Sequence, residues 1–134
     1  MNNKPSFKVF SFVFSDLSEG TRTTTLRKLA NLGGAQTLDC QLKYPRNNPI
    51  PYIIQWKKDG LAQPIFIKYD GYPAQIPHHQ YRNRLALKDE VSLEISQIQA
   101  NDEGWYECNT IFIDGAEETT VNGSWIYLTV HCKY

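Results

Sequence analysis

Long apolar runs, an excess of charge of one sign and a large set of cysteines are all missing from this sequence of 134 residues. No apolar stretch approaches the roughly 20 residues that a membrane-spanning helix needs. Fourteen lysine and arginine residues balance fourteen aspartate and glutamate residues, so the basic excess of a typical nucleic-acid binder is missing too. Hydrophobic residues still make up 41% of the chain, enough to bury the core of one domain. The composition therefore favours a single folded domain.

Signatures of catalysis are also absent. The sequence contains no Gly-x-Ser-x-Gly elbow, no glycine-rich phosphate loop and no residues at metal-ligand spacing. His78 and His79 are adjacent, an arrangement that does not readily chelate one metal ion, and His131 stands alone. We therefore expect a protein that is not an enzyme and that has no cofactor, no metal site and no nucleic-acid partner.

Short β-favouring segments separated by turn residues fill the chain from Leu26 onward. No segment keeps a helical period beyond one or two turns, and only 97–103 predicts a single helical turn. The polar stretches 44–51 and 114–123 are predicted loops. The predicted strands are 35–42, 52–57, 65–69, 84–87, 91–95, 105–113 and 125–130. Many short strands at a spacing of about ten residues indicate a sandwich or a barrel.

Three residues narrow the choice of fold, namely Cys40, Trp56 and Cys108. Their order is the one in which an immunoglobulin sandwich places its inter-sheet disulfide and the indole that packs against it. Tyr106 lies two residues before Cys108, where the hydroxyl of the tyrosine corner bonds back to the preceding turn. We therefore predict an all-β, immunoglobulin-like β-sandwich of two antiparallel sheets, with Cys40 and Cys108 bonded and with Trp56 and Tyr106 in the core.

The long interval between the two cysteines predicts the variable type of this sandwich, because a seven-stranded one needs fewer residues. Residues 65–77 can supply the added C′ and C″ strands. Arg84 precedes the expected D strand and Asp102 the expected F strand, which suits the salt bridge common to variable-type domains. The alternative is that both are ordinary surface charges, which would contribute little to stability.

Several blocks of sequence are more specific than this general pattern. They are Gln-Trp-Lys-Lys-Asp-Gly at 55–60, Pro-Ile-Phe-Ile-Lys at 64–68 and Asn-Gly-Ser-Trp at 122–125, with further matching blocks at 32–40 and 102–108. On these blocks, residues 29–130 resemble the first immunoglobulin domain of the turtle and borderless family of neuronal adhesion proteins. The resemblance implies an extracellular recognition module. It also implies further domains and a membrane span that this chain does not contain.

The two ends of the chain fit the domain less well. Residues 1–25 look like a poor signal-like or disordered leader, because Ser11 interrupts a short apolar block. We expect the domain to occupy 26–130 and a stub to occupy 131–134. With Cys40 and Cys108 paired, Cys132 is left over; it either forms an interchain bridge or marks an end that is not native.

Two kinds of site are predicted. Asn122-Gly123-Ser124 is an N-glycosylation sequon, expected in a loop before the last strand. The sheet face formed by the G, F, C and C′ strands is the usual interaction surface of variable-type domains. Alternation along these strands gives the partner-binding candidates Ile53, Gln55, Lys57, Phe66, Lys68, Glu107, Asn109, Ile111, Trp125 and Tyr127. Aromatic anchors with a polar rim favour protein binding, whereas the alternative is that these aromatics serve strand formation or lie under the leader.

These observations predict an extracellular or cell-surface module for homophilic or heterophilic cell adhesion. The resemblance implies a role in neuronal development, such as axon guidance or the organisation of synapses or dendrites. The expected partner is another immunoglobulin-superfamily ectodomain or a second copy of the same chain. The alternatives are a soluble secreted ligand or decoy, or a fragment of a larger membrane receptor.

Overall fold

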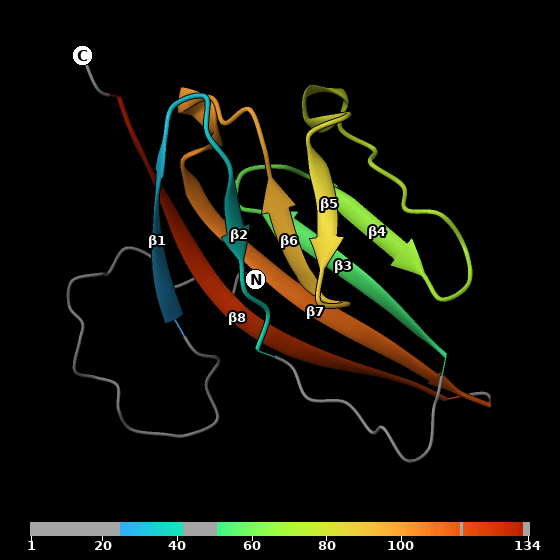
Figure 1. Ribbon diagram of the computed structural model, residues 1–134. Helices are drawn as coiled ribbons and strands as arrows, with labels where there is room; N and C mark the ends of the chain where they lie inside the picture. The colour runs from blue at the N-terminus through green and yellow to red at the C-terminus, as the bar shows by residue number, and fades with distance from the viewer. Residues whose placement is uncertain (1–24, 42–50, 116, 133–134) are drawn as a thin grey trace.

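The computed structural model describes residues 25–41, 51–115 and 117–132, which form two facing sheets (Figure 1). One sheet has the strand order β1-β8-β7-β3-β4 and the other the order β2-β6-β5. The strands are β1 Thr25–Asn31, β2 Gln36–Leu38, β3 Tyr52–Lys58, β4 Phe66–Tyr69, β5 Leu85–Lys88, β6 Ser92–Ile95, β7 Gly104–Asp114 and β8 Glu117–His131. Residues 1–24 of the predicted leader and 44–50 of the first predicted loop lie outside the described residues.

The predicted all-β sandwich is confirmed, with two short 3-10 turns, η2 His79–Tyr81 and η3 Ala100–Asp102, as its helical elements in the described ranges. The η3 turn falls inside the predicted helical segment 97–103. No helix in the described part of the chain is long and apolar enough to cross a membrane.

Among the described strands, β1 departs from the expected antiparallel pairing. It runs parallel to β8, with Thr25 opposite Trp125, while the other strand pairs are antiparallel. The sequence pattern did not predict β1 because its polarity is partly inverted. Lys28 belongs to the inward set, where it forms an ion pair with Asp39, and Leu29 belongs to the outward set and is exposed.

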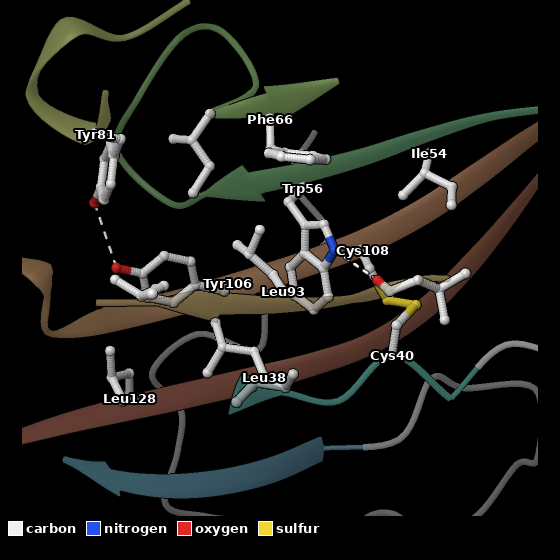
Figure 2. Close-up of a cluster of buried hydrophobic side chains, with 14 of the residues drawn as sticks. Leu38, Cys40, Ile54, Trp56, Phe66, Tyr81, Leu93, Tyr106, Cys108 and Leu128 are labelled. Atoms are coloured by element: carbon white, nitrogen blue, oxygen red, sulfur yellow. Dashed lines mark hydrogen bonds between the residues drawn. A yellow bond between two sulfur atoms is a disulfide. The ribbon is translucent and has the colours of Figure 1, made fainter. Parts of the chain in front are cut away.

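The core lies between the two sheets and is built from alternate residues of the facing strands. Trp56 lies beside the disulfide that joins Cys40 and Cys108 (Figure 2). The indole Nε1 of Trp56 donates a hydrogen bond to the carbonyl oxygen of Val91 at 2.9 Å. A fully buried tryptophan therefore keeps its polar atom satisfied, and the inter-sheet bridge packs against its ring.

A buried polar group closes one end of the core. The guanidinium of Arg84 donates to both carboxylate oxygens of Asp102, at 2.8 and 3.1 Å, and both side chains are shielded from solvent. The hydroxyl of Tyr106 donates to the carbonyl oxygen of Asp102, which is the tyrosine-corner contact. Tyr81 approaches the same hydroxyl at 3.3 Å (Figure 2). The alternative of two ordinary surface charges at Arg84 and Asp102 is therefore wrong.

Strands β7 and β8 form a long hairpin that extends past the smaller sheet (Figure 1). The predicted loop at 114–123 is therefore wrong, because β8 begins at Glu117 and the turn is confined to the residues around Gly115. The first residues of β8 are polar because they are exposed, and this polarity resembles that of a loop. Thr119, Thr120 and Val121 are nevertheless β-branched and favour a strand.

The added strands of the variable type are only partly present. Strand β4 takes the place of C′, paired with β3. Beyond it, only Gln75 forms an isolated bridge with Ile67 among the described residues. The expectation of a full C″ strand at the end of 65–77 is therefore wrong. Pro73 and Pro77 lack the backbone N–H that a sheet ladder requires.

Candidate protein-interaction surface

The candidate surface is the outer face of the five-stranded sheet, the face turned away from β2, β5 and β6. The strand register aligns its residues in rows that cross the strands. The rows are Arg27–Tyr127–Trp105, then Thr25–Trp125–Glu107–Lys57, then Asn122–Asn109–Gln55–Ile67, and last Thr120–Ile111–Ile53–Tyr69. The face thus passes from an aromatic end, through a polar row, to an apolar row.

The aromatic end consists of Trp105, Trp125 and Tyr127, all half-buried. The ring of Trp105 meets those of Trp125 and Tyr127 edge-on, with centroids 6.2 and 5.1 Å apart. The Arg27 guanidinium lies over the Tyr127 ring, 5.7 Å from its centroid. These contacts hold large aromatic side chains in place while parts of them stay open to solvent, which is the character of an interaction anchor.

Glu103 fixes the edge of this aromatic end. One carboxylate oxygen accepts a hydrogen bond from the Tyr127 hydroxyl at 3.2 Å, and the other accepts from the backbone N–H of Val130 at 2.9 Å. Burial, with the nearby Glu103 carboxylate as a second cause, raises the pKa of Tyr127. The Tyr127 hydroxyl thus stays protonated and donates to Glu103.

Glu107 and Asn109 point to the outer face but are not exposed on it. Glu107 is 8% exposed and Asn109 only 4%, so the expectation that they contact a partner from an open surface is wrong. Alternation predicts the direction of a side chain but not its cover, and β7 has neighbouring strands on both sides. Burial raises the pKa of Glu107, and the Lys57 ammonium opposes that effect.

The expected orientation of strand β4 is also wrong. Phe66 lies opposite Trp56 and is 2% exposed, so it belongs to the core. Lys68 lies opposite the buried Ile54 and shares that inward phase. The outward residues are instead Ile67 and Tyr69. Consecutive apolar residues at the start of β4 conceal its phase, and only the pairing with Trp56 fixes it.

The apolar row joins Tyr69, Ile53 and Ile111 across β4, β3 and β7. Tyr69 is 42% exposed and the two isoleucines are half-buried. They make an apolar stripe, and the polar row of Gln55 separates it from the exposed Lys57 in the row of Trp125. Of the candidates from sequence, Ile53, Gln55, Lys57, Ile111, Trp125 and Tyr127 lie on this face with exposed or half-buried side chains.

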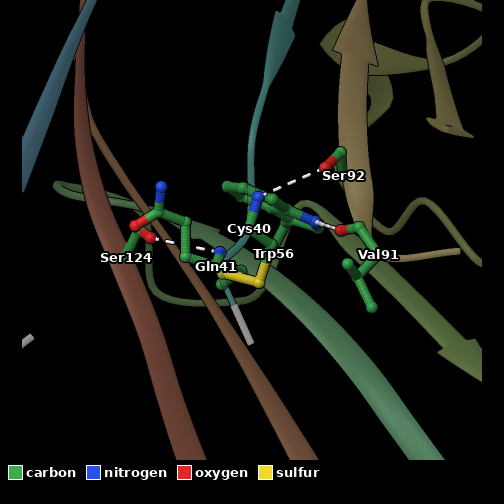
Figure 3. The surroundings of a disulfide bond; sticks show 7 residues. Cys40, Gln41, Trp56, Val91, Ser92 and Ser124 are labelled. Carbon is green, nitrogen blue, oxygen red and sulfur yellow. Dashed lines mark hydrogen bonds between the residues drawn. A yellow bond between two sulfur atoms is a disulfide. The ribbon is translucent and has the colours of Figure 1, made fainter. Parts of the chain in front are cut away.

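The sequon lies within β8, and the expectation of a loop there is wrong. Its three residues have different surroundings. Asn122 is exposed on the outer face, opposite Asn109. Gly123 and Ser124 form a β-bulge opposite Cys108. The Ser124 hydroxyl accepts a hydrogen bond from the backbone N–H of Gln41 at 3.2 Å, beside the disulfide (Figure 3).

The third cysteine, Cys132, lies at the end of the domain. Cys132 is free and exposed just beyond β8.

The class of this domain follows from its strand order, inter-sheet disulfide, buried tryptophan and tyrosine corner. Together they define an immunoglobulin-type recognition domain of the variable class, which is not an enzyme fold. A family model described as "Immunoglobulin V-set domain" matches residues 23–131, and the chain belongs to that family.

Among curated proteins, the chain is similar to human "Protein turtle homolog B", with 38% identity over 103 residues. It is also similar to Drosophila melanogaster "Protein turtle", with 33% identity over 112 residues. Each match covers 76% of this chain, which spans only 8% and 7% of the lengths of those proteins. The resemblance to the turtle group is therefore confirmed for this one domain.

Solved structures agree on the fold. "Structure of the V domain of amphioxus IgVJ-C2" superposes with a TM-score of 0.63 at 24% identity, over 76% of this chain and 97% of that one. This likeness supports the sandwich and its variable type, and it carries no information about a partner.

Proposed function

We propose that this domain is an extracellular adhesion module that binds a second immunoglobulin-superfamily ectodomain through the outer face of its five-stranded sheet. The partner is either another copy of this domain or a related ectodomain. A cell-surface location and a role in neuronal development are what the resemblance to the turtle and borderless family implies. Both remain part of the proposal.

The observation that carries the proposal is that the aromatic end and the apolar row lie on the same face of the sheet. Trp125 and Tyr127 are pre-positioned by contacts with Trp105, so little side-chain entropy would be lost on binding. Tyr69 and the isoleucines beside it offer apolar area, while Lys57 lies in the same row as Trp125. Large aromatics, flanking apolar residues and an exposed charge are the composition of a protein-binding patch.

The test is an aggregation assay with beads that carry the unglycosylated domain fused to a multimerising tag, since multivalency makes weak binding visible. Mixing beads of two colours, with this domain on one and a candidate ectodomain on the other, separates homophilic from heterophilic binding. Trp125→Ala with Tyr127→Ala should abolish aggregation.

A matched pair of charge reversals controls for general effects on the surface. Lys57→Glu changes the outer face beside Glu107, whereas Lys88→Glu changes the opposite sheet beside Glu94. We expect loss of aggregation with the first and wild-type aggregation with the second. Equal behaviour of the two variants would overturn the assignment of the face.

A further inference from the structure

We propose that Asn122 carries an N-linked glycan that masks the interaction face, so that only molecules lacking it can dock. This inference rests on the proposed function, because it requires the outer face to be the binding face. A glycan on a surface loop away from this face would not have this regulatory role.

The position of Asn122 is the first argument. Its register partner on β7 is Asn109, followed in the same row by Gln55 on β3. This polar row lies between the row of Trp125 and the row of Ile111. A bulky, hydrated oligosaccharide attached there would stand between the aromatic end and the apolar row, and a partner could not contact both.

The contrast in exposure along this row is the second argument. Asn122 is exposed, whereas Asn109 opposite it is only 4% exposed, and the Oδ1 atom of Asn109 is buried. A sugar attached to Asn122 therefore cannot sink into the sheet beside Asn109. The glycan would instead stand over the polar row and project from the outer face.

The burial of the sequon determines when the modification can occur. In the transfer reaction, the Asn122 amide nitrogen loses a proton and bonds to the anomeric carbon of a lipid-linked oligosaccharide. The bond from that carbon to the pyrophosphate oxygen breaks, and the lipid pyrophosphate leaves. In the folded domain Gly123 lies against the disulfide and Ser124 is fully buried. The enzyme that transfers the oligosaccharide must therefore bind the sequon before β8 packs. Once the domain has folded, the fractions of molecules with and without the glycan no longer change.

The test uses the whole chain secreted from insect or mammalian cells, with occupancy of Asn122 measured by intact mass. Asn122→Gln removes the acceptor and keeps Gly123 and Ser124. In this background, Glu94→Asn places a new acceptor two residues before Ser96, on the smaller sheet. It therefore moves the glycan to the opposite face.

We expect the fraction occupied at Asn122 not to aggregate beads, and both variants to aggregate them. An unoccupied site, or equal aggregation by the occupied fraction and Asn122→Gln, would overturn the masking and leave the proposed function standing. If Asn122→Gln fails to aggregate with itself and with every ectodomain tested, the proposed function fails and the masking fails with it. If Asn122→Gln aggregates beads but Asn122→Gln with Glu94→Asn does not, a glycan on either face interferes with aggregation. That result would also overturn a mask that is specific to the outer face.

Discussion

Gly123 lies directly against the Sγ atom of Cys108, so a Cβ atom at this position would collide with the disulfide. The same Cβ would lie 3.0 Å from the Sγ atom of Cys40. The glycine in the sequon is therefore required by the bridge, whatever the fate of Asn122. Gly123 belongs to the β-bulge of β8, where two residues of this strand oppose Cys108 alone.

Gly123→Ala should destabilise the domain by about 1–3 kcal/mol, the usual cost of overpacking a core. Denaturant unfolding measures this loss, and titration of free thiols shows whether the bridge still forms. Thr120→Ala is the control, since Thr120 is exposed in the same strand. Equal stabilities of the two variants would contradict the close approach of Gly123 to the disulfide.

The disulfide itself should contribute about 4 kcal/mol, because it closes a loop of 68 residues in the unfolded chain. Reduction, or the double variant Cys40→Ala with Cys108→Ala, should lower the melting temperature. Thermal unfolding with and without a reductant provides the measurement. Unchanged melting would mean that the bridge does not constrain the domain.

Asp102→Asn should be strongly destabilising, by about 3–5 kcal/mol, because it leaves the Arg84 guanidinium buried without its counter-charge. Lys88→Met is the matched comparison. It breaks the more exposed pair with Glu94, whose atoms are 3.7 Å apart, and should cost less than about 1 kcal/mol. Chemical denaturation of both variants tests the contrast, and similar costs would argue against a buried pair.

Glu107 should make the stability depend on pH. Since its pKa is raised in the folded domain, the folded state holds this proton more tightly than the unfolded chain does. The associated stability is fully present below the unfolded pKa of about 4.3 and is lost as pH rises through the raised pKa. Glu107→Gln should flatten this fall in the free energy of unfolding.

Lys57 provides an internal check on that pH dependence. Its ammonium opposes the rise in the pKa of Glu107, so Lys57→Met should move the fall in stability to higher pH. Urea unfolding over a series of pH values measures both variants. A wild-type profile in Glu107→Gln would show that another group is responsible.

The sequence predicted the fold well because the features that define it are local and distinctive. Cys40, Trp56, Tyr106 and Cys108 identify the sandwich through residue type and spacing alone. Strand β1 escaped prediction because Lys28 and Leu29 invert its expected polarity, and its support comes from pairing with β8, far away in the sequence.

The candidate surface was only partly predictable. Alternation placed Ile53, Ile111 and Trp125 correctly, since their strands have a clear inward set. It failed at Phe66, where cross-strand register decides the phase, and at Asn109, where burial depends on neighbouring strands. The face to which a side chain points can be predicted locally where a strand has a clear inward set. At an edge strand such as β4 the face depends on the register with the next strand, and the burial of a central residue depends on its neighbours in the fold.

The central claim, docking through the outer face, is tested most directly by nuclear magnetic resonance of the unglycosylated, isotope-labelled domain. The labelled domain is titrated with unlabelled copies, or with the ectodomain that the two-colour assay identifies as its partner. We predict chemical-shift changes at the amides and side chains of Ile53, Lys57, Tyr69, Ile111 and Trp125, with β2, β5 and β6 unchanged. Changes confined to the smaller sheet, with the outer face unperturbed, would contradict the account.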